Sequence, residues 1–91
     1  MSTKVKIGPL LQEYLEIPVV LEVSGSTVGE CLDDLIRQYP EIRTWLFDQN
    51  SLVRVLVSVN NAEIVSLDKE GSKRILKQND ELQIFAVVAG G

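Results

Sequence analysis

Histidine is absent from this sequence, and cysteine occurs only once, as Cys31. The lack of histidine removes the commonest general base, and with it the usual nucleophile–histidine–acid triad and most zinc sites. A single cysteine excludes an internal disulfide and any metal site built from several thiolates of the chain. We therefore expect a protein that is not an enzyme by itself and that binds no cofactor or metal ion.

Long apolar runs and a basic surface are also lacking. No apolar segment approaches the roughly 18–20 residues that cross a bilayer, and the first residues, Met1 to Lys4, contain no apolar stretch typical of a signal peptide. We expect a cytoplasmic protein without membrane contact. The formal net charge of −4 argues against nucleic acid as a partner and favours docking on a basic protein surface.

The N-terminal part of the chain predicts a pair of strands. Its two apolar segments are residues 5–11 and residues 17–23. The first is interrupted by Gly8-Pro9, which indicates an edge, a bulge or a bend. The second alternates with a period of two, as a strand does. Residues 12–16 are expected to form the hairpin loop between them.

A helix is predicted to begin after Thr27. Thr27 and Glu30 have the spacing of a capping box, in which the threonine hydroxyl accepts from the Glu30 amide and the glutamate reaches back to the Thr27 amide. Asp33 and Arg37 are spaced for an i,i+4 ion pair on the solvent side. Pro40 ends the helix. The apolar positions at helical spacing are Val28, Leu32, Leu35 and Tyr39.

The middle of the chain predicts a hairpin. Residues 41–48 fit a short second helical turn. Val53–Val59 is the clearest strand of the sequence because valine occupies every second position. Asn60 and Asn61 tolerate the positive φ angles of a tight turn, and residues 62–65 are expected to return as a strand.

The element order predicts an α+β domain. Residues 66–79 are polar, with Ile75 and Leu76 as the expected anchor to the core, and residues 82–88 form a final strand that is wholly uncharged and so suits a central position. The order is strand, strand, helix, strand, strand, strand. We expect residues 1–91 to form one domain, a mixed sheet of four to five strands with one main helix on one face.

The chain ends in its three smallest side chains, Ala89-Gly90-Gly91. Glycine has no Cβ, so a diglycine can thread a narrow channel and let a catalytic surface close on the backbone. The α-carboxyl of Gly91 is ionised at neutral pH and available to attack a phosphorus atom. Adenylation would make it a mixed anhydride, from which sulfide or a thiol could displace AMP. We therefore expect Gly91 to be the activated residue, with Gly90 and Ala89 in a thin, flexible tail of residues 88–91.

Together these features resemble the β-grasp sulfur carriers, which are ubiquitin-like proteins that include the small subunit of molybdopterin synthase and the thiamine-pathway carrier. The resemblance covers nearly the whole chain. It is carried by the element order, the Thr27 cap, the Val53–Val59 strand with its asparagine turn, and the terminal diglycine. It implies a β-grasp fold and a Gly91 that an E1-like adenylating enzyme activates with ATP and converts to a thiocarboxylate. A sulfur-accepting synthase subunit is the second implied partner.

Two departures bear on the pathway. Many molybdopterin carriers have prolines in the last strand, where this sequence has Phe85-Ala86-Val87-Val88-Ala89, and Asn79 stands where glycine is common. The Thr27-Val28-Gly29 helix start and the Val-Ala-Gly-Gly ending are closer to the carriers that deliver sulfide for cysteine biosynthesis. The resemblance thus implies sulfur donation in molybdopterin-type cofactor or cysteine biosynthesis.

Some residues invite a functional interpretation that the sequence does not favour. Cys31 is expected to be a small core residue, because no histidine can activate it. The acidic residues at the helix start, Glu30, Asp33 and Asp34, are explained by the helix dipole. Asp80 and Glu81 are expected in a turn, and Trp45 in packing.

An apolar partner-binding surface is the remaining candidate site. Phe85, Leu56 and Val87 are expected on the sheet face that the helix does not cover, where they would contact a partner, as in β-grasp relatives. The alternative is that a loop or the segment from Trp45 to Phe47 covers them.

Two other functions remain open. In the first, the chain is a protein modifier conjugated through Gly91 to lysines of other proteins, and its chemistry up to the adenylate is the same. In the second, it is a plain interaction domain that uses only its sheet face, and its function would survive deletion of Gly91.

Overall fold

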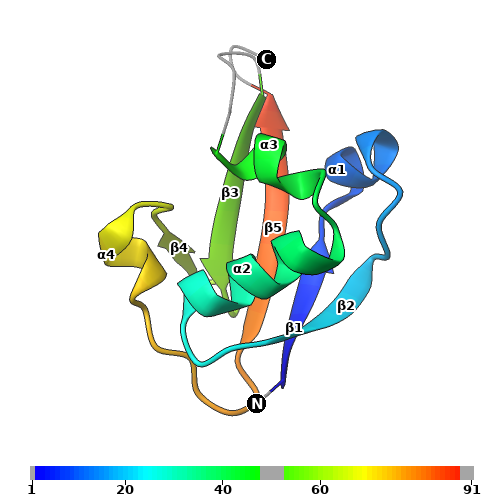
Figure 1. Ribbon diagram of the computed structural model, residues 1–91. Helices are drawn as coiled ribbons and strands as arrows, with labels where there is room; N and C mark the ends of the chain where they lie inside the picture. Colours follow the sequence, from blue (N-terminus) through cyan, green and yellow to red (C-terminus); the bar gives the residue numbers. More distant parts are fainter. Residues whose placement is uncertain (1, 48–52, 89–91) are drawn as a thin grey trace.

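A computed structural model describes residues 2–47 and 53–88 of the chain. Five strands form one mixed sheet in the order β2-β1-β5-β3-β4, with the longest helix packed across one face (Figure 1). No helix in these two ranges is long and apolar enough to span a bilayer. The elements are β1 (Ser2–Ile7), α1 (Pro9–Tyr14), β2 (Val20–Ser24), α2 (Val28–Gln38), α3 (Ile42–Phe47), β3 (Val53–Val59), β4 (Glu63–Val65), α4 (Lys69–Ser72) and β5 (Glu81–Val88).

The N-terminal hairpin differs from the prediction in its connection. β1 stops at Ile7, and the expected loop is mostly a short helix, α1, with Pro9 in its first turn. Proline fits there because its fixed φ is helical and its missing N–H would have no partner in the helix. Leu11 is fully buried and anchors α1 to the core, which the strand interpretation of residues 5–11 did not foresee. β2 also begins later than expected, at Val20.

β5 occupies the centre of the sheet, as its lack of charge predicted. It runs parallel to β1, with Lys4–Ile7 opposite Glu81–Ile84, and antiparallel to all of β3. A central strand is covered by backbone partners on both sides, so charged side chains along it would have to be desolvated. β5 is therefore held by strand pairing on both sides. Its last residue lies at one end of the sheet, and the first residue of β1 lies at the other end (Figure 1).

α2 begins and ends as predicted, but two of its side-chain contacts differ. Thr27 Oγ1 accepts from the Glu30 N–H at 3.1 Å, while the Glu30 carboxylate accepts from the backbone N–H and hydroxyl of Ser26, one residue before the expected donor. Arg37 pairs with Asp34 at i,i+3, and the predicted pair with Asp33 is wrong. Asp34 is preferred because it also accepts from the Ser24 N–H at 2.9 Å, which fixes its carboxylate over β2.

The hairpin of β3 and β4 follows the sequence closely. Asn60 and Asn61 have φ angles of 54° and 57°, the left-handed conformation expected of the turn. β4 is only three residues long and leaves the sheet at Ser66 towards α4, a helix that the sequence analysis did not predict. In the segment after α4, Leu76 is buried, whereas Ile75 is 67% exposed and does not anchor the core as expected.

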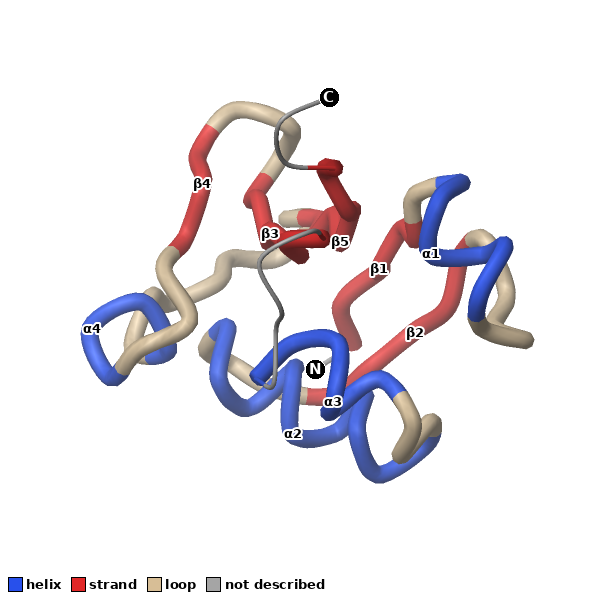
Figure 2. Tube along the Cα trace, turned by 90° about the horizontal axis from the view of Figure 1, so that it is seen from above, coloured by secondary structure: helices blue, strands red, loops and turns tan. Residues whose placement is uncertain are grey.

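α2 and α3 lie on the same side of the sheet (Figure 2). The buried residues of α2 are Val28, Cys31, Leu32 and Leu35, and they pack on the inward side chains of β1, β2, β3 and β5. Each such apolar side chain contributes about 1.5–3 kcal/mol when fully buried. Within the described ranges, no helix covers the central strands on the other side. We call that side the open face, and its side chains alternate along each strand with those of the core.

Candidate functional site

The described part of the site begins at the end of β5. Val88 pairs with Val53 and Val87 pairs with Arg54, so β3 supports β5 to its last residue. Val88 therefore belongs to the sheet. The residues expected to carry the chemistry and to thread the partner, Ala89, Gly90 and Gly91, lie outside the described residues. Whatever position Gly91 takes, its attachment point is a strand hydrogen-bonded into the centre of the fold.

An apolar surface lies beside this attachment point on the open face. Leu56 and Phe85 are opposite each other on β3 and β5, and Val87 follows on the same face of β5. Leu56 and Phe85 are half-buried, and Val87 is 40% exposed. The segment from Trp45 to Phe47 does not cover them, because α3 lies on the other side of the sheet (Figure 2). The three predicted partner-binding residues thus form one surface, which we call the open-face patch; its role in binding stays a prediction.

Gly8 determines how closely the chain approaches this patch. A Cβ built on Gly8 would lie 3.0 Å from Phe85 Cβ and 3.3 Å from Phe85 Cα. The Gly8 N–H also donates to the Ile84 carbonyl at 2.8 Å, which locks the start of α1 against β5. Any side chain at position 8 would therefore push on Phe85. Gly8 is predicted from the sequence only as a strand interruption, although a glycine that ends a strand is also a signal of close backbone approach.

A buried polar network borders the patch. Gln83 is only 7% exposed although it lies on the open face of β5. Its Oε1 accepts from the Ser58 hydroxyl at 2.7 Å and from the Asn61 N–H at 2.8 Å, while its buried Nε2 has no hydrogen-bond partner among the described residues. The two accepted bonds fix the Gln83 amide against β3 and the following turn. This network adds two side-chain hydrogen bonds to the strand pairing beside Leu56 and Phe85.

The other titratable candidates serve the fold. Cys31 is fully buried as expected, and burial raises the pKa of its thiol. Hydrogen bonds from Ser26 lower the pKa of Glu30, and those from Ser24 and Arg37 lower the pKa of Asp34. Asp80 accepts from the Asn60 amide at 2.9 Å, which lowers its pKa and ties the last turn to the β3–β4 turn. Residues 2–47 and 53–88 contain no group of three or more metal-ligating side chains.

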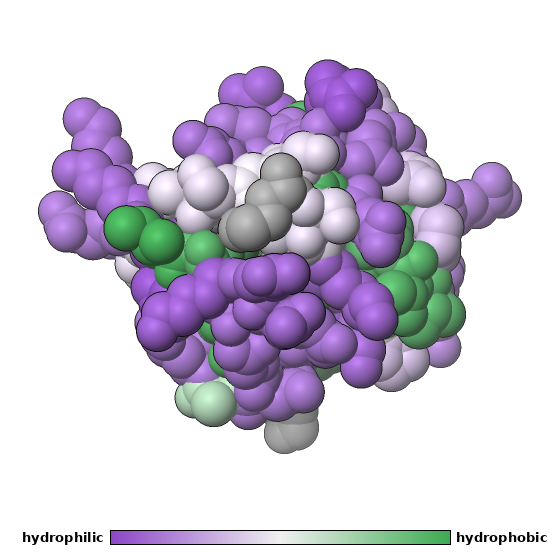
Figure 3. All heavy atoms as spheres, turned by 90° about the horizontal axis from the view of Figure 1, so that it is seen from below, coloured by the Kyte–Doolittle hydropathy of each residue, from purple (hydrophilic) through white to green (hydrophobic). Residues whose placement is uncertain are grey.

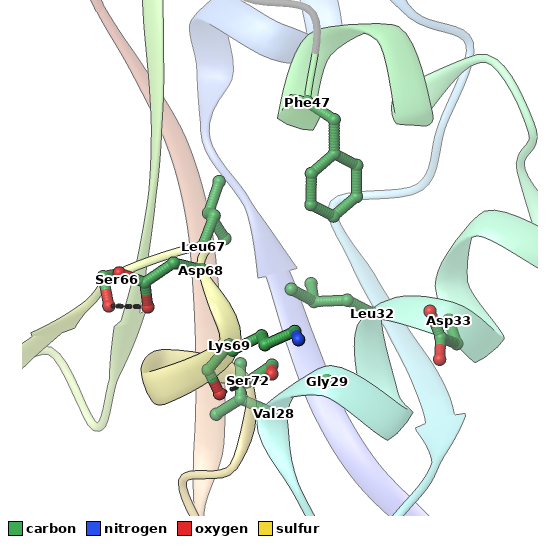
Figure 4. A pocket seen from close by; sticks show the side chains of 10 residues that line it. All are labelled: Val28, Gly29, Leu32, Asp33, Phe47, Ser66, Leu67, Asp68, Lys69 and Ser72. Carbon is green, nitrogen blue, oxygen red and sulfur yellow. Dashed lines mark hydrogen bonds between the residues drawn. The ribbon is translucent and has the colours of Figure 1, made fainter.

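A separate hollow of 310 Å³ lies on the helix side, between α2, α3 and α4 (Figure 4). Leu32, Phe47 and Leu67 supply much of its apolar lining. Its hydroxyl groups are committed to local structure, because Ser66 Oγ donates to Asp68 Oδ1 at 2.8 Å and Ser72 Oγ donates to the Lys69 carbonyl at 2.9 Å. The charged side chains of the lining, Asp33 and Lys69, come from different helices, and no carboxylate or nucleophile cluster forms around them among the described residues, so we do not place the chemistry there.

The end of the molecule farthest from the last residue of β5 is mostly hydrophilic, with hydrophobic side chains only in separate small areas (Figure 3). Polar residues line a depression there, including Lys4, Glu22, Asp80 and Glu81. Glu81 forms an ion pair with Lys6 at 3.5 Å. The open-face patch and the last residue of β5 therefore lie near each other, at the opposite end of the sheet.

Comparisons with known proteins agree with this arrangement. Residues 10–91 match the ThiS family. The chain is similar to one in the crystal structure of the Amycolatopsis orientalis BexX/CysO complex, with 28% identity, coverage of 98% of this chain and 99% of that one, and a TM-score of 0.73. It is also similar to small archaeal modifier protein 1 (SAMP1) from Methanosarcina acetivorans, with 25% identity, coverage of 99% and 96%, and a TM-score of 0.74. For SAMP1 from Haloferax volcanii the identity is 26%, the coverage is 100% of both chains and the TM-score is 0.67.

No curated protein matches the chain significantly. The family match covers most of the sequence, and the five-stranded sheet with its single long helix has the fold of these structural neighbours. The expected resemblance and the expected β-grasp fold are both confirmed. The chain belongs to the ThiS family of β-grasp sulfur carriers and ubiquitin-like proteins.

Proposed function

We propose that this protein is a sulfur carrier whose Gly91 carboxylate is adenylated and converted to a thiocarboxylate. The observation that carries the proposal is the end of β5. There a central strand, paired with β3 up to Val88, ends beside the apolar open-face patch, and the sequence continues as Ala89-Gly90-Gly91. An enzyme that binds the open-face patch fixes the position of the sheet, and the thin tail can then reach a buried active site.

Each step has a defined balance of atoms. A carboxylate oxygen of Gly91 attacks the α-phosphorus of ATP, which forms the acyl adenylate and releases pyrophosphate. Hydrosulfide then attacks the carbonyl carbon, AMP leaves with the electrons of the cleaved C–O bond, and a proton is lost. The product is a thiocarboxylate at Gly91. Binding of ATP and catalysis belong to an E1-like partner, since this chain offers only the carboxylate.

We assign the sulfur-accepting step to a synthase subunit in molybdopterin-type cofactor or cysteine biosynthesis. We expect all of these reactions to take place in the cytoplasm. Similarity to a chain of the BexX/CysO complex supports a synthase-type partner. The Val88-Ala89-Gly90-Gly91 ending supports the cysteine branch.

Intact-mass measurement tests the proposal. The protein, isolated without a C-terminal tag, is incubated with its cognate adenylating enzyme, ATP and sulfide. We expect the mass increase of one oxygen-to-sulfur exchange, dependent on ATP and confined to the C-terminal peptide. Deletion of Gly91 is the matched control and should abolish the increase. Normal exchange in the deleted protein, or no exchange in the intact one, would contradict the proposal.

Similarity to SAMP1, a modifier protein by name, supports a second candidate function, conjugation through Gly91 to lysines. Lys77 is the last trypsin site of the chain, so a conjugate digested with trypsin would carry residues 78–91 on the modified lysine. Ala89→Arg would shorten this remnant to Gly-Gly and make it detectable by standard enrichment. Remnants that depend on Gly91 support conjugation, and their absence from cells that produce the thiocarboxylate leaves sulfur transfer as the function.

A further inference from the structure

The protein is acidic, but its charges are not evenly placed. Acidic side chains gather on α2, where Glu30, Asp33 and Asp34 lie on the helix side of the sheet. The two cross-strand pairs at the end of the open face, Leu56–Phe85 and Arg54–Val87, contain a cation and no carboxylate. Among the described residues, these two pairs therefore carry a positive charge, although the molecule as a whole is acidic.

Arg54 is the cation in question. Its side chain is exposed and makes no hydrogen bond or ion pair with the described residues, whereas Arg37 and Arg74 are paired with Asp34 and Glu63. A planar guanidinium that no described side chain or carbonyl engages is well suited to a bidentate contact with a carboxylate. Arg54 lies directly across from Val87, so any group bound to it is close to the start of the tail.

A hollow of 420 Å³, which we call the β3–β4 hollow, adjoins this arginine. It exists because β4 pairs only with Val57–Val59 of β3 and then leaves the sheet at Ser66. Gly71 allows α4 to pack closely against this point, since a Cβ there would lie 1.7 Å from the Ser66 carbonyl oxygen. The lining residues are Arg54, Val55, Leu56, Ile64, Val65, Ser66 and Leu67. Most of them are apolar.

We propose that Arg54 and the β3–β4 hollow together bind a protein segment in which a carboxylate stands next to an apolar side chain. We take the adenylating enzyme as the partner, so this inference rests on the function proposed above. The carboxylate pairs with Arg54, and the apolar side chain fills the hollow. A phosphate group fits less well, because a dianion needs several cations or backbone N–H groups and the hollow offers one guanidinium. The expectation of a basic partner surface, drawn from the net charge, is thereby reversed for this contact.

Binding of the cognate adenylating enzyme to charge variants tests this proposal. Calorimetry gives the Kd directly, and ATP–pyrophosphate exchange gives KM and kcat for the carrier. We expect Arg54→Glu to raise Kd and KM by about tenfold or more, and Arg54→Gln to raise them by a few-fold, with kcat unchanged. Lys4→Glu is the matched control, because Lys4 is also an exposed open-face cation that makes no ion pair with the residues of ranges 2–47 and 53–88, but it lies at the far end of the sheet. It should change Kd less than twofold.

Three further outcomes are decisive. An Arg54→Glu variant that binds as well as Lys4→Glu, or more tightly than the unmodified chain, overturns the inference. An Arg54 effect on Kd that appears only when ATP is present identifies nucleotide phosphate as the anion and also overturns it. If the enzyme binds the carrier through Arg54 but never adenylates Gly91, the proposed function fails while the inference stands. Circular dichroism of each variant confirms that it is folded.

Discussion

Leu56 on β3 and Phe85 on β5 lie directly opposite each other on the sheet face that α2 leaves uncovered. Directly opposed residues on neighbouring strands have Cβ atoms about 4.5–5.5 Å apart, so the two side chains pack as a unit. Gly8 approaches Phe85 from one side, and Arg54 and Val87 continue the surface towards the end of β5. The Leu56–Phe85 pair thus lies on the sheet near the end of β5, the strand that precedes the diglycine in the sequence.

Truncation of this pair should weaken recognition by the adenylating enzyme. Leu56→Ala and Phe85→Ala should each raise the KM for the carrier in ATP–pyrophosphate exchange by about tenfold, as for an apolar residue at the centre of an interface. The kcat should stay the same, since the reacting carboxylate is unchanged. Both residues are half-buried, so stability should fall by only about 1–2 kcal/mol, which urea denaturation measures.

Val20→Ala is the matched control for these variants. Val20 is an exposed apolar residue on the edge strand β2, opposite Lys6 and away from the patch. Its truncation should change KM less than twofold. Equal effects of Val20→Ala and Phe85→Ala would show that general surface hydrophobicity, and not the open-face patch, governs binding.

Gly8→Ala should disturb the patch without straining the backbone. The φ and ψ of Gly8 are −69° and 157°, which alanine adopts readily, so the conflict is steric, with approaches of 3.0 Å to Phe85 Cβ and 3.3 Å to Phe85 Cα. We expect a loss of about 1 kcal/mol in unfolding free energy and a displacement of the Phe85 ring, visible as chemical-shift changes centred on residues 84–86. Combining Gly8→Ala with Phe85→Gly, which removes the contacted Cβ atom, gives a double-mutant cycle. Fully additive losses would contradict direct contact between the two sites.

Much of the fold was predictable because local signals agreed with the tertiary structure. The valine alternation of β3, the paired asparagines and the Thr27 cap each encode their own geometry. The central position of β5 was also predictable, since a strand without charge tolerates burial on both edges. α1 was not predicted because a proline such as Pro9 can either interrupt a strand or begin a helix. Only the burial of Leu11 distinguishes these two possibilities.

The site was predictable in part for the same reason. Leu56, Phe85 and Val87 follow from strand alternation once the covered face is known. Arg54 and Gly8 were overlooked, because their importance comes from what lies across the sheet. An arginine near the start of the run from Val53 to Val59 was a visible signal, but its partner Val87 is far away in sequence. The hollow beside Arg54 depends on where β4 leaves the sheet. A strand of only three residues gives no sequence signal for that position.

Acid should destabilise the protein through its hydrogen-bonded carboxylates. The pKa values of Glu30, Asp34, Asp68 and Asp80 are lowered in the fold by accepted hydrogen bonds. Groups with a lowered pKa contribute stability that is present above their unfolded pKa values and is lost as the pH falls through the folded ones. We expect the urea midpoint to be nearly constant between about pH 5.5 and 8, because the chain has no histidine, and to fall below about pH 5.

Asp80→Asn separates one of these contributions. The variant should be less stable than the unmodified chain at neutral pH, and the difference should shrink as the pH approaches 3. Asp33→Asn is the control, because Asp33 is exposed on α2 and makes no hydrogen bond or ion pair with the described residues. A difference for Asp80→Asn that stays the same at all pH values would contradict an ionic role for Asp80.

Cys31 should be chemically unreactive in the folded protein, although we propose that the protein carries sulfur at Gly91. Its side chain is fully buried among the residues of α2 and the sheet, and burial raises the pKa of the thiol, so little thiolate is available to react. An aromatic disulfide reagent should label the folded protein far more slowly than the urea-unfolded protein, with a rate that follows the unfolding equilibrium. Cys31→Ala should cost about 1–2 kcal/mol in stability and leave thiocarboxylate formation at Gly91 intact. A folded Cys31→Ala variant that accepts no sulfur would show that this thiol takes part in the transfer.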